Sequence, residues 1–192
     1  MSVFNKISEG FALGTTSPVV EGQEDWLYIF NEADVTITYN QTNPLIVTGL
    51  AAVDGAFIYK FTGTNNSFKN SVKSNKTIVG PRYAEELDFN IAGNASDIKA
   101  TIMALGYGRV RAIVVNNFKA TDGAIELFGA NNGMIAGESD KNEASVGGWT
   151  VKLTPPDKLM EPYPPRSVLI APVSGAATYA TTLAAIEALV SA

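Results

Sequence analysis

The chain has 192 residues, of which 46% are hydrophobic and only 17% charged, a composition typical of a globular protein with few surface charges. Its 14 Lys and Arg against 19 Asp and Glu give a net charge of −5, opposite in sign to what a stable nucleic-acid binder needs. The absence of Cys and His excludes disulfides, thiolate nucleophiles, Ser-His-Asp triads and the usual zinc sites. We therefore expect a non-enzymatic protein, with one domain over residues 1–192 and without catalytic, cofactor-binding or metal residues.

Residues 1–20 contain Gly and Pro among small and polar residues and follow neither a helical nor a strand period, which predicts an N-terminal arm. Its apolar side chains, Phe4, Ile7 and Phe11 among them, predict packing either on a neighbouring subunit or on the arm's own domain. The segment does not resemble a secretory signal, and no run approaches the roughly 20 apolar residues of a membrane helix. We expect synthesis in a cytoplasm and no membrane partner.

Four strands are expected before residue 62. The run 26–30 is continuously apolar, and 34–39 alternates with period two, so the short loop between them predicts a hairpin. Strands at 45–48 and 56–61 follow the turn signals Asn43-Pro44 and Asp54-Gly55.

Residues 62–82 are rich in Asn, Ser and Lys and nearly free of acidic side chains, which predicts a long loop. Its basic residues Lys69, Lys73 and Lys76 favour contact with an acidic patch on another copy of the chain. A plain solvated loop is an open alternative. A phosphate-binding loop has less support, because neither an aromatic platform nor a helix N-terminus accompanies the lysines.

The next segments predict a strand at 83–92 and a flanking helix at about 94–105, ended by Gly106 and Gly108. The prolines between 155 and 172 discourage a central strand there, so the short run 167–170 is expected at a sheet edge or in a connector. Apolar residues at helical spacing predict a second helix at about 176–190, inside a C-terminal helical extension, 174–192.

The stretch 109–155 contains three apolar runs, 109–115, 124–128 and 149–153, separated by polar segments, as consecutive antiparallel strands are. Its polar insert 136–146 is expected to be a loop. The predicted fold is mainly β, a β-sandwich or half-barrel of antiparallel strands with one internal helix and a C-terminal helix.

Two groups of residues suggest chemistry. Glu85, Glu86 and Asp88 are the densest acidic group, but on a strand Glu86 and Asp88 share one face and Glu85 points the other way, so a solvated face is favoured over a glycosidase pair. Trp26 and Trp149 would suit a sugar-binding groove, although aromatic residues more commonly fill cores and interfaces.

The sequences at 110–118, at 124–134 (AIELFGANNGM) and at 147–154 (GGWTVKLT), followed by EPYPPR at 161–166, resemble the later half of phage tail tube proteins. The resemblance implies the fold shared with the inner tube of type VI secretion systems and hexameric rings stacked into a tube in the virion. It also implies tape-measure, terminator or baseplate partners, and DNA that passes without stable binding. Under this interpretation Lys69, Lys73, Lys76 and the arm contact other subunits, and Glu86, Asp88 and Glu126 face the lumen.

Two other functions remain open. Another ring-forming tail component, a terminator or adaptor, would form rings that never stack. A carbohydrate-binding β-sandwich module would use Trp26 and Trp149.

Overall fold

The computed structural model describes residues 23–62, 67–78, 80–93, 95–117, 119, 122–142, 148–156 and 159–190, which form a mainly β fold with two helices. This confirms the predicted fold class. The predicted arm, with Phe4, Ile7 and Phe11, lies outside the described residues. The elements are β1 (Gln23–Asn31), β2 (Val35–Tyr39), β3 (Ile46–Ala52), β4 (Tyr59–Thr62), β5 (Phe68–Thr77), β6 (Gly80–Ala92), α1 (Ser96–Tyr107), β7 (Val110–Asn116), β8 (Ile125–Phe128), β9 (Ile135–Asn142), β10 (Gly148–Thr154), β11 (Arg166–Val168) and α2 (Tyr179–Glu187).

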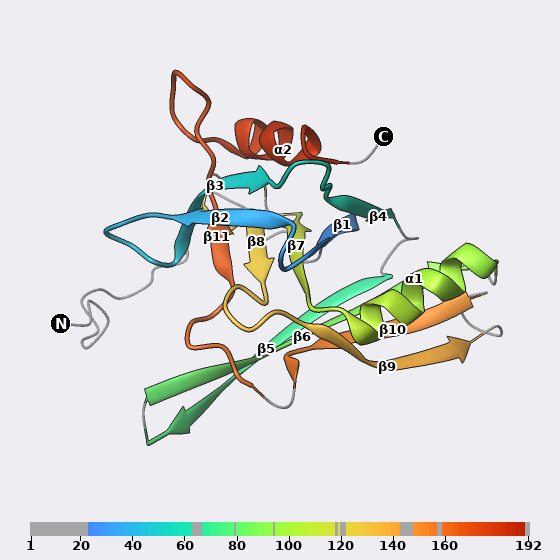
Figure 1. The fold of residues 1–192 in the computed structure, drawn as a ribbon. Helices are drawn as coiled ribbons and strands as arrows, with labels where there is room; N and C mark the ends of the chain where they lie inside the picture. Colours follow the sequence, from blue (N-terminus) through green and yellow to red (C-terminus); the bar gives the residue numbers. More distant parts are fainter. Residues whose placement is uncertain are drawn as a thin grey trace.

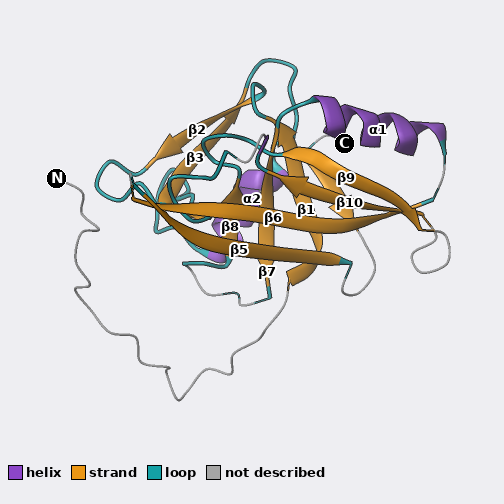
Figure 2. Cartoon of the chain, turned by 90° about the horizontal axis from the view of Figure 1, so that it is seen from below, coloured by secondary structure: helices purple, strands orange, loops and turns teal. Residues whose placement is uncertain are grey.

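The strands form two sheets. One has seven strands in the order β2-β3-β11-β8-β7-β1-β4, and the other has four in the order β5-β6-β10-β9. The four-stranded sheet lies across one side of the seven-stranded sheet, and α1 runs alongside β9 (Figure 1). Seen from below, β5, β6, β10 and β9 run side by side in front of the larger sheet (Figure 2). The architecture is therefore a sandwich of two unequal sheets.

β1 and β7 are buried on both faces. Along β1, Leu27 and Ile29 point into a core shared with the four-stranded sheet and α1, whereas Tyr28 and Phe30 point into a second core. The second core is enclosed by the seven-stranded sheet and by Ile186 of α2. Burial on both sides explains why these strands read as continuous apolar runs instead of alternating patterns.

The seven-stranded sheet curls strongly. Three residues, 32–34, join β1 to β2, although β1 is sixth and β2 first in the sheet order. Because three residues span about 10 Å at most, the two ends of the sheet must approach each other, which gives the half-barrel shape. The predicted hairpin between these strands is wrong: β1 pairs with β4 and β7, and β2 pairs with β3.

Two segments predicted as loops are strands. Most of the predicted loop 62–82 is β5 and the start of β6, paired from Phe68↔Phe89 to Thr77↔Gly80. The predicted loop 136–146 falls largely in β9, which pairs with β10. Both are edge strands whose side chains largely face water, so they lack the apolar alternation that identifies a half-buried strand. Their place in the fold comes from backbone pairing with β6 and β10.

The C-terminal third also differs from expectation in part. β11 was predicted at a sheet edge or in a connector, but it is the third strand of the larger sheet, parallel to β3 and antiparallel to β8. It tolerates the nearby prolines because none falls within its three residues. The two predicted helices are present as α1 and α2, and α2 has a capping box between Thr178 and Thr181.

The close approach of β10 to β6 at Gly148 can be tested by substitution. A Cβ there would lie 2.1 Å from the Ile91 carbonyl oxygen, so we expect Gly148→Ala to force β10 from β6 and destabilise the fold by about 1–3 kcal/mol. Gly106→Ala is the control, because a Cβ there meets nothing within 4 Å and should stabilise α1 by about 0.5–1 kcal/mol. Urea unfolding followed by tryptophan fluorescence measures both; equal stabilities of the two variants would contradict the close approach.

Candidate functional site: the outward face and edges of the four-stranded sheet

The four-stranded sheet has one apolar face and one charged face. On β6, Leu87 and Phe89 are buried in the core, while Glu86 and Asp88 alternate with them and face outward. On β10, Val151 and Leu153 are buried and Lys152 faces outward. The face that points away from the rest of the molecule is thus polar along its whole width.

Charges alternate across this face from edge to edge. Lys69 on β5 lies opposite Asp88 on β6, Asp88 lies opposite Lys152 on β10, and Lys152 lies opposite Glu138 on β9. Opposite charges on directly facing residues stabilise an antiparallel sheet. We call these four residues the charge row. It begins with a lysine at one sheet edge and ends with a glutamate at the other.

Ion pairing sets the electrostatics of the row. Lys152 Nζ lies 3.1 Å from Glu86 Oε1, and the hydrogen bond with this carboxylate raises the pKa of Lys152. Desolvation raises the pKa of Asp88, against the opposing effect of Lys152. In the part of the sheet where all four strands are paired, the outward face carries two lysines, Lys69 and Lys152. It also carries three acidic residues, Asp88, Glu138 and Asp140. The face therefore has a small excess of negative charge.

We call both edges of this sheet open because, in the described part of the chain, no further strand pairs with them; α1 lies alongside β9. β5 pairs only with β6, over ten residues, and β9 pairs only with β10. Their outer N–H and C=O groups are the usual template for pairing with another strand.

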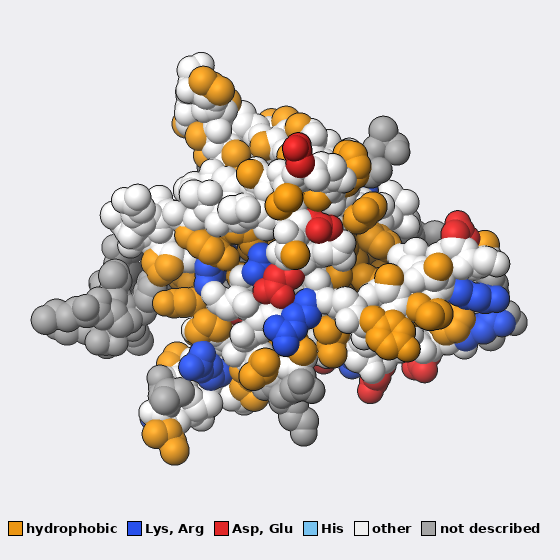
Figure 3. Space-filling view, in the orientation of Figure 1, with side chains coloured by type: hydrophobic (Ala, Val, Ile, Leu, Met, Phe, Trp, Pro, Cys, Tyr) orange, Lys and Arg blue, Asp and Glu red, His pale blue; other side chains and the backbone are white. Residues whose placement is uncertain are grey.

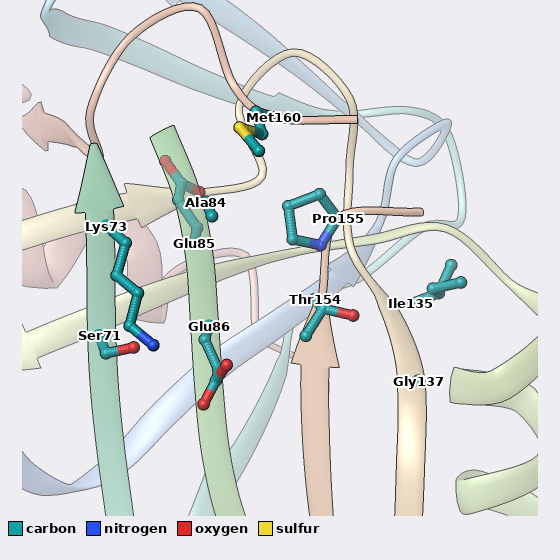
Figure 4. A pocket seen from close by; sticks show the side chains of 10 residues that line it. All are labelled: Ser71, Lys73, Ala84, Glu85, Glu86, Ile135, Gly137, Thr154, Pro155 and Met160. Atoms are coloured by element: carbon teal, nitrogen blue, oxygen red, sulfur yellow. The ribbon is translucent and has the colours of Figure 1, made fainter. Parts of the chain in front are cut away.

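A pocket of about 480 Å³ opens where β6 extends beyond its pairing with β10 and pairs with β5. Figure 4 shows Ser71 and Lys73 of β5 on one side, Glu86 of β6 in the middle, and Thr154 with Pro155 on the other side. The side chains of Glu85 and Glu86 point in different directions. The pocket separates the end of the β5–β6 hairpin from β10, and the described residues place no histidine or cysteine there to act as a nucleophile or base.

Two buried carboxylates hold the turn between β8 and β9. Glu85 is 2% exposed, and its Oε2 accepts the Gly129 N–H at 2.7 Å. Glu161 is 1% exposed and accepts the backbone N–H groups of Asn131 and Asn132, the latter at 2.7 Å. Burial raises the pKa of Glu85 to about 8, against the effect of the Gly129 hydrogen bond.

Arg166 completes this polar cluster. Its Nη2 donates to Asn131 Oδ1 at 2.8 Å, and its guanidinium lies 4.2 Å from the Tyr39 ring centroid and 5.1 Å from that of Tyr163. Glu161 and Arg166 are the first and last residues of the EPYPPR segment, but no role in a buried cluster was predicted for them. Their only visible signal was the Asn131-Asn132-Gly133 turn, whose donors need acceptors from elsewhere in the chain.

The predicted contact and lumen residues are partly brought together. Lys69 and Lys73 share the outward face of β5, and Lys76, three residues on, falls on the other face by alternation. Glu86 and Asp88 lie on the outward face, opposite in direction to the buried Glu85, as alternation predicted. Glu126 is apart from them: it lies on β8 in the other sheet, where its Oε2 accepts from Asn116 Nδ2.

The tryptophans do not form a shared platform. Trp26 packs against the core inside the curled sheet, and Trp149 packs against the core between the sheets. The Nε1 atoms of both are buried. In the described residues no three His, Cys, Asp or Glu side chains are grouped so that they would hold a metal ion, and neither helix is long and apolar enough to cross a membrane.

Apolar side chains are widely exposed on another face of the molecule. Figure 3 shows hydrophobic side chains spread over the regions of α1 and α2, with charged side chains among them. On α1, Tyr107 is 88% and Met103 62% exposed. Large exposed apolar side chains commonly mark surfaces that contact another protein.

Comparisons with protein-family models, curated proteins and solved structures find no match to this chain.

The role of Glu161 in holding the turn can be measured. Glu161→Ala leaves the N–H groups of Asn131 and Asn132 without their acceptor inside the protein, so we expect a loss of about 2–4 kcal/mol in the free energy of unfolding. Glu138→Ala, an exposed carboxylate on β9, should change it by less than about 1 kcal/mol. Urea unfolding of both variants is the measurement, and similar losses would show that Glu161 does not hold the turn.

Proposed function

We propose that the protein is a structural subunit that assembles with copies of itself into rings, and that these rings stack into a phage tail tube. The observation that carries the proposal is the charge row, which ends in Lys69 at one open edge and Glu138 at the other. When β9 of one copy meets β5 of the next, the alternation of charge continues across the boundary.

Strand direction supports head-to-tail pairing. The four strands are antiparallel in succession, so β5 and β9 run in opposite directions. A rotation that brings β9 of one copy beside β5 of the next therefore extends the sheet in the same antiparallel pattern. A head-to-tail interface of this kind closes into a ring when the rotation closes. Closure would remove both open edges.

The charged face suits the wall of a channel. With the apolar face packed on its own subunit, the outward face of each copy would line one surface of the ring. Its slight excess of acids, which includes Asp88, does not favour stable binding of a phosphate backbone. The proposed lumen residues are thus Glu86 and Asp88. Glu126, on the other sheet, is not among them.

Two alternatives have less support. A terminator or adaptor would use the same edges but form rings that do not stack. A carbohydrate-binding module requires exposed aromatic platforms, whereas Trp26 and Trp149 pack against separate cores.

Charge reversal at the two edges tests the proposed interface. Lys69→Glu makes both edges acidic and Glu138→Lys makes both basic, so we expect each variant alone to remain folded but to lose ring formation. Mixed in equal amounts, the two variants present complementary edges at every interface of an alternating ring, and assembly should return if the ring has an even number of subunits. Light scattering and electron microscopy measure assembly, and circular dichroism measures folding.

Asp54→Lys is the matched control, because it reverses an exposed acid in the turn between β3 and β4. It should assemble like the unchanged chain. If the unchanged chain stays monomeric at all concentrations, the proposed function is wrong. If it assembles and neither single variant affects assembly, the interface lies elsewhere. Rings that never stack would favour the terminator or adaptor.

A further inference from the structure

The free end of the β5–β6 hairpin is a two-stranded ribbon. In the described residues, β10 pairs with β6 from Leu87 to Ala92. Residues 80–86 of β6 pair with 71–77 of β5 and, at Tyr83 alone, form an isolated bridge with Glu161. We call residues 71–77 and 80–86 the ribbon. A two-stranded ribbon has little stability in water without packing on another element. Its position therefore depends on its attachments to the rest of the protein.

Four attachments to the body are seen. At the surface, Glu86 Oε1 lies 3.1 Å from Lys152 Nζ of β10. Glu85 Oε2 accepts the Gly129 N–H at 2.7 Å. Tyr83 and Glu161 exchange two backbone hydrogen bonds, of 2.9 and 2.8 Å. Asn75 Nδ2 lies 3.5 Å from Met160 Sδ, a weak contact at the surface. Glu85 makes the side-chain attachment that is buried.

Open space lies on both sides of the ribbon. The pocket of about 480 Å³ separates it from the ends of β9 and β10. A second one, of about 520 Å³, lies between Val72, Ser74 and Tyr83 of the ribbon and Glu126, Phe128 and Pro164 of the body. Val72, which shares the inner face with Glu85, is 39% exposed. The ribbon is thus held at a few points and not by a continuous core.

Glu85 is surrounded by unbalanced charge. It faces two carboxylates, Glu161 and Glu126 on β8, and one guanidinium, Arg166 on β11. An ionised Glu85 would be the third carboxylate near one guanidinium. Arg166 is engaged by Asn131 and by two tyrosine rings. A charge on Glu85 is therefore poorly compensated where it lies, and water would stabilise it better.

We propose that Glu85 is a proton-operated latch: its protonated carboxyl holds the ribbon against the body, and loss of the proton releases the ribbon. The direction follows from linkage. Glu85 is neutral in the closed ribbon up to about pH 8, whereas in an opened ribbon it would ionise near its usual pKa of 4.5. Opening thus releases a proton between these values, and the opening equilibrium rises about tenfold per pH unit across that window.

Amide hydrogen exchange of the full chain measures the latch directly. The experiment uses monomeric protein, at a concentration where light scattering shows a single copy. If the chain assembles even then, the Lys69→Glu variant is used instead. The outcome is then independent of the proposed function. We expect protection factors of the ribbon amides to fall about tenfold per pH unit from about pH 5 to about pH 8. Amides of β1 and β7 should stay better protected throughout.

Glu85→Gln keeps the shape and the acceptor for Gly129 but does not titrate, so its ribbon protection should lose this pH dependence. Glu138→Gln, an exposed carboxylate on β9 outside the ribbon, is the matched control and should keep it. The ¹³C shift of the Glu85 carboxyl should titrate far above that of an exposed glutamate. Ribbon protection that is independent of pH, or ribbon amides that exchange only together with β1 and β7, would overturn the latch.

Discussion

Burial of β1 and β7 on both faces is the constraint on which the rest of the structure depends. Leu27 and Ile29 need an apolar layer on one side, and Tyr28 and Phe30 need another on the opposite side. The curled sheet with α2 supplies one layer, and the four-stranded sheet with α1 supplies the other. Because the second layer uses only one face of the four-stranded sheet, its other face and the β5 edge are left to contact solvent or another protein, while α1 lies alongside β9.

This constraint explains which parts of the fold the sequence predicts. Strands in the two cores carry apolar runs, and all of them, including β1, β7, β8 and β10, were expected near their observed positions. β5 and β9 were not, because an edge strand with water on most sides needs few apolar residues. The order of the strands in the sheet was also not predictable. The three-residue link after β1 is compatible with a hairpin, and also with a second strand that lies elsewhere in the sheet.

The candidate site is predictable to the extent that it depends on alternation. The opposite directions of Glu85 and Glu86 follow from the period of a strand, and this was correct. The cluster around the turn 129–133 was not predicted, because Glu85 and Glu161 reach that turn across 44 and 30 residues of chain. Nor does any local pattern indicate that Glu138 ends a row of charge that Lys69 begins, because that relation depends on the register of three strand pairs.

The latch and the proposed ring interface involve the same element. β5 supplies the edge that would meet β9 of the next copy, and its outer half is part of the ribbon attached through Glu85. A ribbon that leaves the body would take that half of the edge out of line with the charge row. If the chain assembles as proposed, a single buried carboxyl would therefore link proton concentration to the length of edge available for pairing. A fully apolar residue at position 85 would pack the same space but would not provide this link.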